Sequence, residues 1–336
     1  MNKKRNILLT FDYELFLGKR SGSIDRCVIE PTGKIIKVLN QYKAKAIFFV
    51  DTAWLVRLKE ITINNSKAKE DYDRVVTQLH QLVKDGHYIF NHLHPHWIDA
   101  KYIEKINQWD LSDSSRYRFN SLDNKTKSEL FAKTSLLLKN IIESVVKDYD
   151  TDGYRAGGWS IQPFDEFKPY FQQYGIKFDF SVMTGMKSIT TAQQYDFSGI
   201  FAEQPYRFSD DFVASVSGEF TEFPINNIVI SSPTLFLSRI MLKYLHLKGD
   251  TGSGDGTSVL REVLDGMTNS AEMLSLELLT YPKLSAYLGF LRKHSYMHFI
   301  SHPKMLSAHN INTFARFMKK AFSEYTVETD FRKMVP

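Results

Sequence analysis

The 336-residue sequence is poor in cysteine and has no long apolar runs. Its single cysteine, Cys27, excludes an internal disulfide and a cysteine-rich zinc site. No apolar run approaches the ~20 residues of a transmembrane helix, and the start of the chain lacks the apolar stretch and cleavage site of a signal peptide. The formal net charge of +5 is spread along the chain, so it gives no reason to expect a nucleic-acid partner. We therefore expect a cytoplasmic location. The run Leu235–Leu247 fits a helix core or an amphipathic face on a membrane surface, which keeps peripheral membrane association open.

Short apolar runs alternate with amphipathic helical patterns along the chain. Helices are predicted from Pro31 and over Ser66–Asp85 and Lys125–Asp148. Strands are predicted at Ile7–Phe11, Ala46–Val50, Tyr88–Phe90, Gly153–Arg155, Ile176–Phe178, Phe220–Ile230 and Met297–Ser301. This alternation favours a mainly parallel α/β sheet, closed or nearly closed into a barrel. We expect one domain over residues 1–336, with an insertion or subdomain at 215–290 before the last strand.

Ionisable residues stand at the ends of five predicted strands. Parallel α/β folds bind ligands at the carboxyl ends of their strands, and barrels build catalytic sites there. Charged residues can also simply mark where strands stop, but five of them favour one shared site. They are Asp12, His92, Arg155, Asp179 and His302.

Four of the ten histidines lie in the segment Gly86–Trp97, GHYIFNHLHPHW. His92 and His96 are four residues apart, which on a helical turn would place both imidazoles on one face, within reach of one metal ion. His94 is an alternative ligand, because His94 and His96 would share a face in an extended segment. The same letters also fit an ordinary aromatic-rich loop.

Asp12 and Glu14 add two carboxylates, spaced two residues apart in FDYE. One of them can bind a metal while the other handles protons. Two imidazoles and one carboxylate form an open three-ligand site. Zinc suits this mixed nitrogen and oxygen set best, with cobalt, nickel and iron as alternatives. The other interpretation of the two carboxylates is a solvated turn or a helix N-cap.

The order of these motifs, Asp-x-Glu, HxxxH, Arg, Asp and a late His-Pro, resembles the polysaccharide deacetylases, the NodB-like carbohydrate esterases of family 4. The resemblance implies a distorted, incomplete (β/α) barrel, here of about seven parallel strands. It also implies a divalent metal, usually zinc, and removal of acetyl groups from N-acetylated sugars. The matching segments are LLTFDYE (8–14), KAIFFVDTAWL (45–55), GHYIFNHLHPH (86–96), GYRAGGWS (153–160), YGIKFDFSV (174–182), FTEFPI (220–225) and FISHPKM (299–305).

The resemblance also implies roles for individual residues. Asp12 matches the catalytic base and Arg155 the arginine that orients it. His302 resembles the general acid, and Asp179 resembles the aspartate that polarises this histidine. The metal ligands implied by the family's pattern are Glu14, His92 and His96, with Glu14 taken from branches that space the second carboxylate as D-x-E.

Four further residues are expected to contact substrate. The backbone N–H of Gly158 falls where an oxyanion donor is expected. Trp97 and Trp159 flank motif residues, so they can stack on a pyranose ring or belong to the core. Tyr13 takes the position at which the family usually has an aspartate.

The sequence thus predicts a metal-dependent hydrolase of carbon–nitrogen bonds that deacetylates an amino sugar of a polysaccharide or surface-glycan precursor. The alternatives are another metal-dependent amide hydrolase, a glycoside hydrolase on a related barrel, and a non-catalytic carbohydrate-binding relative. A glycosidase would use two carboxylates without metal, so sensitivity to a chelator separates it from the leading prediction. The oligomeric state stays open.

Overall fold

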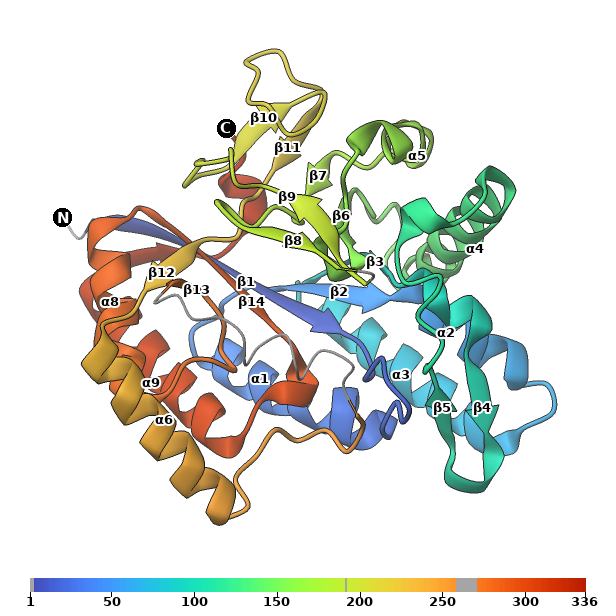
Figure 1. Ribbon diagram of the computed structural model, residues 1–336, viewed down its shortest axis with the longest axis horizontal. Coiled ribbons are helices and arrows are strands. Elements are labelled where there is room, and N and C mark those ends of the chain that lie inside the picture. The colour runs from blue at the N-terminus through green and yellow to red at the C-terminus, as the bar shows by residue number, and fades with distance from the viewer. Residues whose placement is uncertain (1–2, 191, 258–270) are drawn as a thin grey trace.

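A nine-stranded, mostly parallel sheet forms the centre of the protein in a computed structural model, which describes residues 3–190, 192–257 and 271–336 (Figure 1). The strand order is β10-β11-β7-β6-β3-β2-β1-β14, and β15 pairs with the beginning of β1. The strands are Lys4–Tyr13 (β1), Ile47–Asp51 (β2), Tyr88–Leu93 (β3), Gly153–Ala156 (β6), Phe178–Asp179 (β7), Tyr206–Phe208 (β10), Phe220–Glu222 (β11), Tyr296–Ser301 (β14) and Thr326–Glu328 (β15).

The seven neighbouring strands from β11 to β14 all run parallel. Only β10 is antiparallel to its neighbour within this sheet. In the described residues the two ends of the order, β10 and β14, do not pair with each other, so the barrel is incomplete. The predicted fold, a distorted and incomplete (β/α) barrel of about seven parallel strands, is therefore confirmed.

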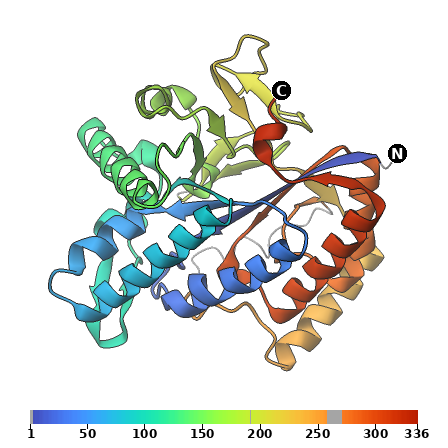
Figure 2. The same cartoon turned by 180° about the vertical axis from the view of Figure 1, so that it is seen from behind.

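Helices cover the outer face of this sheet, as the view from behind shows (Figure 2). Side chains cap the first turns of two of these helices. The side chain of Asn65 accepts a hydrogen bond from the N–H of Ala68 at the start of α3, and Asp123 caps α4 in the same way through Thr126. The helices are Glu30–Gln41 (α1), Thr52–Ile61 (α2), Ser66–Lys84 (α3), Asn124–Glu143 (α4), Lys168–Tyr174 (α5), Ser232–Leu247 (α6), Leu284–Lys293 (α8) and Ala308–Glu324 (α9). None of the helices in the described ranges has both the length and the apolar character to cross a membrane.

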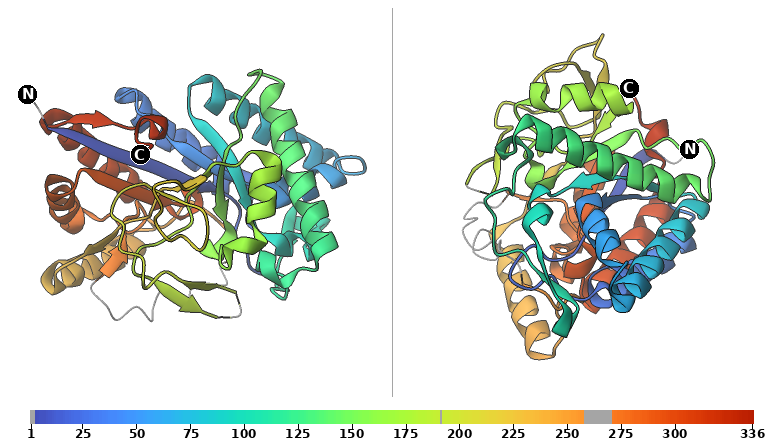
Figure 3. Two further views of the ribbon diagram at one scale, coloured as in Figure 1. Left: turned by 90° about the horizontal axis from the view of Figure 1, so that it is seen from above. Right: turned by 90° about the vertical axis from the view of Figure 1, so that its right-hand side faces the viewer.

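Three two-stranded antiparallel sheets lie in the connections between the main strands (Figure 3). They pair Lys101–Ile103 (β4) with Gln108–Asp110 (β5), Lys187–Ile189 (β8) with Gln194–Asp196 (β9), and Asn227–Val229 (β12) with Ala271–Met273 (β13). The short turn Gly157–Trp159 lies between β6 and α5, and its residues Gly158 and Trp159 line a cavity.

The inside of the incomplete barrel is filled by aromatic rings. Phe331, from the turn that follows β15, packs against rings from β3, β7 and β11 or the residues just after them. Phe49, Phe90 and Phe180 form the next layer. Above them the guanidinium of Arg155 lies 4.1 Å from the centroid of the Phe49 ring. An apolar floor therefore supports a charged layer at the carboxyl ends of the strands.

Two predicted strands differ from the observed ones. The run Phe220–Ile230 was expected to form one strand, but it is divided into β11 and β12, with Pro224 between them. Proline lacks the N–H that a continuous ladder needs. The run Ile176–Phe178 begins pairing only at Phe178. The insertion at 215–290 stays a proposal: β11 belongs to the main sheet, whereas β12 and β13 pair only with each other.

Candidate active site

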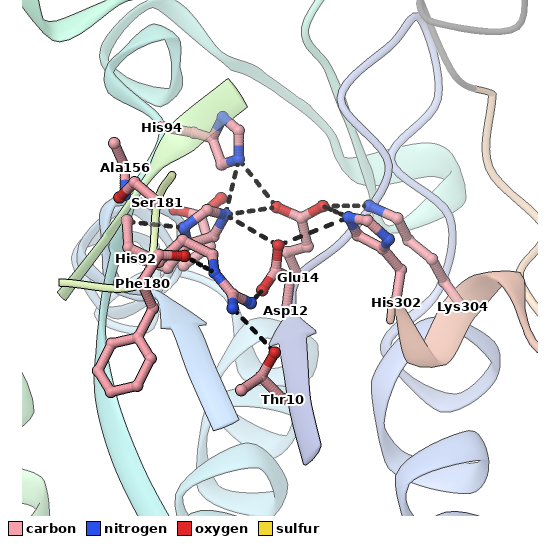
Figure 4. Close-up of polar contacts among 12 residues, drawn as sticks. Thr10, Asp12, Glu14, His92, His94, Ala156, Phe180, Ser181, His302 and Lys304 are labelled. Atoms are coloured by element: carbon pink, nitrogen blue, oxygen red, sulfur yellow. Dashed lines mark hydrogen bonds and ion pairs between the residues drawn. The ribbon is translucent and has the colours of Figure 1, made fainter. Parts of the chain in front are cut away.

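The first strand places three functional side chains on one face. Thr10, Asp12 and Glu14 alternate along β1 and its extension, and residues two apart in a strand point to the same side. His92 on β3 and Arg155 on β6 are direct partners in the parallel ladder. Figure 4 shows the side chains of Thr10, Asp12, Glu14 and His92 converging at the carboxyl ends of the strands.

Arg155 and Asp12 form a fully buried ion pair. The guanidinium donates to Oδ1 of Asp12, to Oγ1 of Thr10 at 2.8 Å and to the carbonyl of Phe180 at 3.0 Å. Burial by itself raises the pKa of Asp12, but Arg155, His92 and His302 outweigh it and lower this pKa below its usual value. Asp12 is therefore held as a carboxylate, with one oxygen occupied by Arg155.

Glu14, His92 and His94 form a cluster with the geometry of a metal site. Their donor atoms all lie within 4.8 Å of one another. Oε2 of Glu14 is 3.3 Å from Nε2 of His92 and 3.0 Å from Nε2 of His94, and the two Nε2 atoms are 3.0 Å apart. All three residues are buried, and this oxygen has no hydrogen-bond partner in the described part of the chain. Buried donors that face one another in this way fit a shared cation.

The surroundings of this cluster leave the correct nitrogen of His92 available. Nδ1 of His92 lies 2.9 Å from the carbonyl oxygen of Arg155, to which it donates, so in the neutral imidazole that binds a metal Nε2 carries the lone pair. Although burial disfavours an imidazolium, the carboxylates of Asp12 and Glu14 raise the pKa of His92 to about 9. The donor set thus attracts positive charge, as a divalent-metal site requires.

Lys304 forms an ion pair with the second carboxylate oxygen of Glu14. Its ammonium donates to Oε1 at 2.8 Å and to the carbonyl of Leu15 at 2.6 Å. Burial raises the pKa of Glu14, but Lys304 and His94 outweigh it and hold this pKa well below its usual range. The carboxylate is consequently ionised and oriented, with Oε2 toward the two imidazoles.

His302, directly after β14, faces the same centre from the other side. Its Nε2 is 3.6 Å from Oδ2 of Asp12, and its Nδ1 is 2.8 Å from Oε1 of Glu277. Burial lowers the pKa of His302, yet the carboxylates, Glu277 above all, raise it overall. The imidazole is therefore suited to carry a proton on Nε2.

Asp179 does not contact His302, contrary to the role expected for it. It accepts hydrogen bonds from the backbone and hydroxyl of Ser181, at 3.0 and 2.9 Å. The same hydroxyl accepts from the N–H of Ala156, the residue after Arg155. Glu277, in the irregular segment between β13 and α8, contacts Nδ1 of His302 instead.

His96 is not brought to the Glu14 cluster. The HxxxH prediction assumed a helical turn, but the chain stays extended through His94, so His92 and His94 share a face, and His96 lies in the turn Pro95–Asp99 that follows. The ring of His96 stacks on Tyr117 at 4.7 Å, and neither of its nitrogens has a hydrogen-bond partner among the described residues. Burial lowers its pKa to about 3.

The expected substrate residues divide into two pairs. Gly158 and Trp159 line the cavity above the site. Gly158 has a φ of +59°, and a Cβ there would lie 2.9 Å from the ring of Tyr117, so glycine is required. Trp97 and Tyr13 lie in the core instead: Trp97 is fully buried and donates to Asp51, and the hydroxyl of Tyr13 donates to Gln78 on α3. Neither lines the cavity.

The sequence analysis missed three residues that contact the site. Thr10 and Lys304 lie inside segments that were singled out, and their position two residues from Asp12 and His302 was an available signal. Glu277 lies in an irregular stretch with no distinguishing pattern. The cavity wall also includes Tyr117, Tyr195 and four methionines, none of which the sequence marked.

Comparisons with known proteins bear on the fold and on the first part of the chain. Residues 1–154 match the family model described as polysaccharide deacetylase. The fold is similar to that of a candidate polysaccharide deacetylase from Mycobacterium smegmatis, with 14% identity, a TM-score of 0.51, and coverage of 99% of this chain and 89% of that one. It is also similar to 4-α-glucanotransferase from Thermococcus litoralis, with 11% identity, a TM-score of 0.50, and coverage of 98% and 40%. These identities support the fold alone. No curated protein sequence matches the chain.

Proposed function

We propose that this protein is a metal-dependent hydrolase that removes the N-acetyl group from an amino sugar of a polysaccharide or surface-glycan precursor, because residues 1–154 match the family model described as polysaccharide deacetylase. The expectation of a deacetylase-type hydrolase acting on carbon–nitrogen bonds is confirmed by the same match. The observation that carries the rest is one cavity that brings together Asp12, the Glu14 cluster and His302.

Glu14, His92 and His94 would hold the divalent ion. Their two nitrogens and one oxygen suit zinc best, with cobalt, nickel and iron as alternatives. When bound, such an ion acts as a Lewis acid that polarises a carbonyl and lowers the pKa of water from 15.7 to about 7.

Asp12 acts as the base in this proposal. Its Oδ1 is held by Arg155, so Oδ2 accepts the proton of the attacking water. The lowered pKa of Asp12 keeps this oxygen ionised at neutral pH. Arg155 keeps the carboxylate in one orientation through its additional bonds to Thr10 and Phe180.

His302 acts as the acid. Glu277 holds Nδ1, which leaves the Nε2 proton directed at the cavity, where the amine departs. The raised pKa of His302, caused above all by Glu277, favours the protonated imidazole that supplies this proton. The N–H of Gly158 stabilises the developing oxyanion, and Trp159 supplies an apolar wall for the sugar ring.

Acetate release from a panel of N-acetylated sugars, measured with and without a chelator, tests this proposal. We expect chelation to abolish release and added zinc to restore it. Asp12→Asn should keep its metal but lose about 100-fold or more of turnover, the scale of a missing general base. The exposed Asp73, which pairs with Lys69 on α3, provides the control Asp73→Asn, with turnover unchanged.

Release that persists without metal would contradict the proposal. If chelation has no effect and the protein cleaves a glycosidic bond, the glycoside hydrolase alternative replaces it. Unchanged turnover in Asp12→Asn would remove the base role.

A further inference from the structure

Helix α6 exposes an apolar stripe along its length. Phe236, Ile240, Tyr244 and Leu247 are spaced by four, four and three residues, which places them on one face of a helix. Their exposed fractions are 64, 51, 58 and 76%, and that of Leu237 beside them is 55%. Large apolar side chains exposed together on one face mark an interaction surface more often than isolated ones do.

The opposite face attaches the helix to the protein. Ser238 is the one buried residue of α6, and its hydroxyl lies 2.8 Å from that of Thr280. Helix α6 lies at the edge of the molecule in Figures 1 and 3. Because attachment is through the face that bears Ser238, the apolar stripe points away from the barrel.

Basic residues border this stripe. Arg239 and Lys243 on the helix and Lys248 just after it are all exposed, and the sequence from 223 to 249 contains no aspartate or glutamate. The ammonium of Lys248 lies 5.8 Å from the centroid of the Tyr244 ring. Next to α6, the half-exposed Tyr281 has the guanidinium of Arg316 5.1 Å from its ring centroid.

We propose that α6 binds the surface of an anionic lipid bilayer. An apolar stripe with aromatic residues, bordered by lysine and arginine and free of acidic residues, is the pattern of a helix that lies in the membrane interface. Phe236 and Tyr244 would enter the headgroup region, while Arg239, Lys243 and Lys248 meet anionic headgroups. At 16 residues, α6 is shorter than the ~20 residues of a membrane-crossing helix.

This surface is connected to the cavity through the chain on both sides of α6. The strand before the helix, β12, pairs with β13, whose Met273 lines the cavity. After the helix, Gly254 and Gly256 pack closely on Phe16, another cavity residue. A bilayer bound at α6 would therefore hold the catalytic domain at the surface on which lipid-attached glycans are located.

Flotation of the purified full-length protein with vesicles tests the proposal. We expect binding to vesicles of equal parts phosphatidylcholine and phosphatidylglycerol, weaker binding to phosphatidylcholine alone, and release by high salt. Phe236→Ser with Ile240→Ser should weaken binding about tenfold or more, and so should Arg239→Gln with Lys243→Gln.

Matched controls come from exposed residues elsewhere. Ile63→Ser removes an apolar side chain that is 84% exposed, and Lys125→Gln with Lys133→Gln removes two charges from α4; both should bind like the unaltered protein. Acetate release from a soluble amino sugar should be the same in all variants, so this test is independent of the proposed activity. Absence of vesicle binding, equal binding by the α6 variants, or a dimer that only these variants lose would overturn the proposal. The last outcome would assign the stripe to a second copy.

Discussion

At the scale of single residues, four functional groups in the cavity each have one polar atom held by a neighbour and a second one left for chemistry. The held atom fixes the orientation, so the free atom needs little reorganisation when a ligand arrives. The pairs are His92 with the carbonyl of Arg155, Asp12 with the guanidinium of Arg155, Glu14 with Lys304, and His302 with Glu277.

The choice between His94 and His96 as the third ligand can be tested by metal analysis. His94→Ala should weaken zinc binding by more than the roughly 10–100-fold that loss of an outer hydrogen-bond partner costs, because Nε2 of His94 faces both Glu14 and His92. His96→Ala should retain zinc. The control His80→Ala alters a half-buried histidine on α3 far from the site. Loss of zinc in His96→Ala but not in His94→Ala would reverse the assignment.

Glu277 is predicted to be a positioning residue for His302. Glu277→Gln removes the negative charge next to Nδ1, so kcat should fall about 10- to 100-fold, while KM and metal content stay unchanged. The control is Glu203→Gln, which alters a comparable but surface contact between Glu203 and His294, 3.1 Å apart. An increase in KM or a loss of zinc with unchanged kcat would show that Glu277 instead supports the binding site.

At the scale of elements, the site depends on how far β3 remains a strand. Pairing between β3 and β6 continues through Leu93 and Ala156, so the chain is still extended at His94. Directly after β6, Gly157 lets the two segments approach: a Cβ at this position would lie 2.4 Å from the carbonyl oxygen of Leu93 and 2.8 Å from Nδ1 of His94. The absence of one side chain therefore makes room for a metal ligand.

Gly157→Ala should damage the metal site more than the fold. The added methyl group cannot fit without displacing His94 or the end of β3, so we expect about tenfold or more weaker zinc binding. The circular dichroism spectrum should remain that of the parent protein. Gly33→Ala provides the control, since a Cβ at that position of α1 meets no atom within 4 Å. Unchanged zinc affinity in Gly157→Ala would mean that the backbone adjusts without moving His94.

At the scale of the whole molecule, the barrel separates an apolar floor from a charged upper layer. Phe331 reaches the floor from the end of the chain, so residues beyond the last helix complete the support under Arg155. Outside the barrel, His87 connects α3 to β3 and accepts a hydrogen bond from the N–H of Ala46 at 3.2 Å. It is buried, with 3% of its surface exposed.

The stability of the protein should fall between pH 6.5 and pH 4 because of His87. Burial lowers the pKa of His87 to about 4 in the folded state. The unfolded state therefore binds more protons in this range, and stability rises with pH, by on the order of 3 kcal/mol across the window. His87→Gln keeps an acceptor for Ala46 without titrating, so its free energy of unfolding in urea should fall less between pH 7.5 and pH 4.5. Equal pH dependence in both proteins would contradict this assignment.

From sequence alone, the alternation of strands and helices predicted the barrel, and the residues at strand ends predicted that Asp12, His92, Arg155, Asp179 and His302 share one site. Asp12 does lie next to His92, Arg155 and His302, whereas Asp179 does not take the contact with His302 that was expected of it. This worked because parallel strands bring their carboxyl ends to one edge, so a local position in the sequence determines a position in space. The seven strand predictions each correspond to observed strands, although the run Phe220–Ile230 is divided.

Only the tertiary structure decided which neighbours complete the site. Whether His94 or His96 joins His92 depends on strand pairing with β6, and the contact of Glu277 with His302 depends on the path of an irregular segment. Tyr13 lies between Asp12 and Glu14, and Trp97 follows the histidine-rich segment, yet both side chains point into the core. A local sequence pattern indicates whether a segment is a helix or a strand and which face is apolar. Contacts between distant segments depend instead on how the elements pack, and this packing determined the remaining partners in the site.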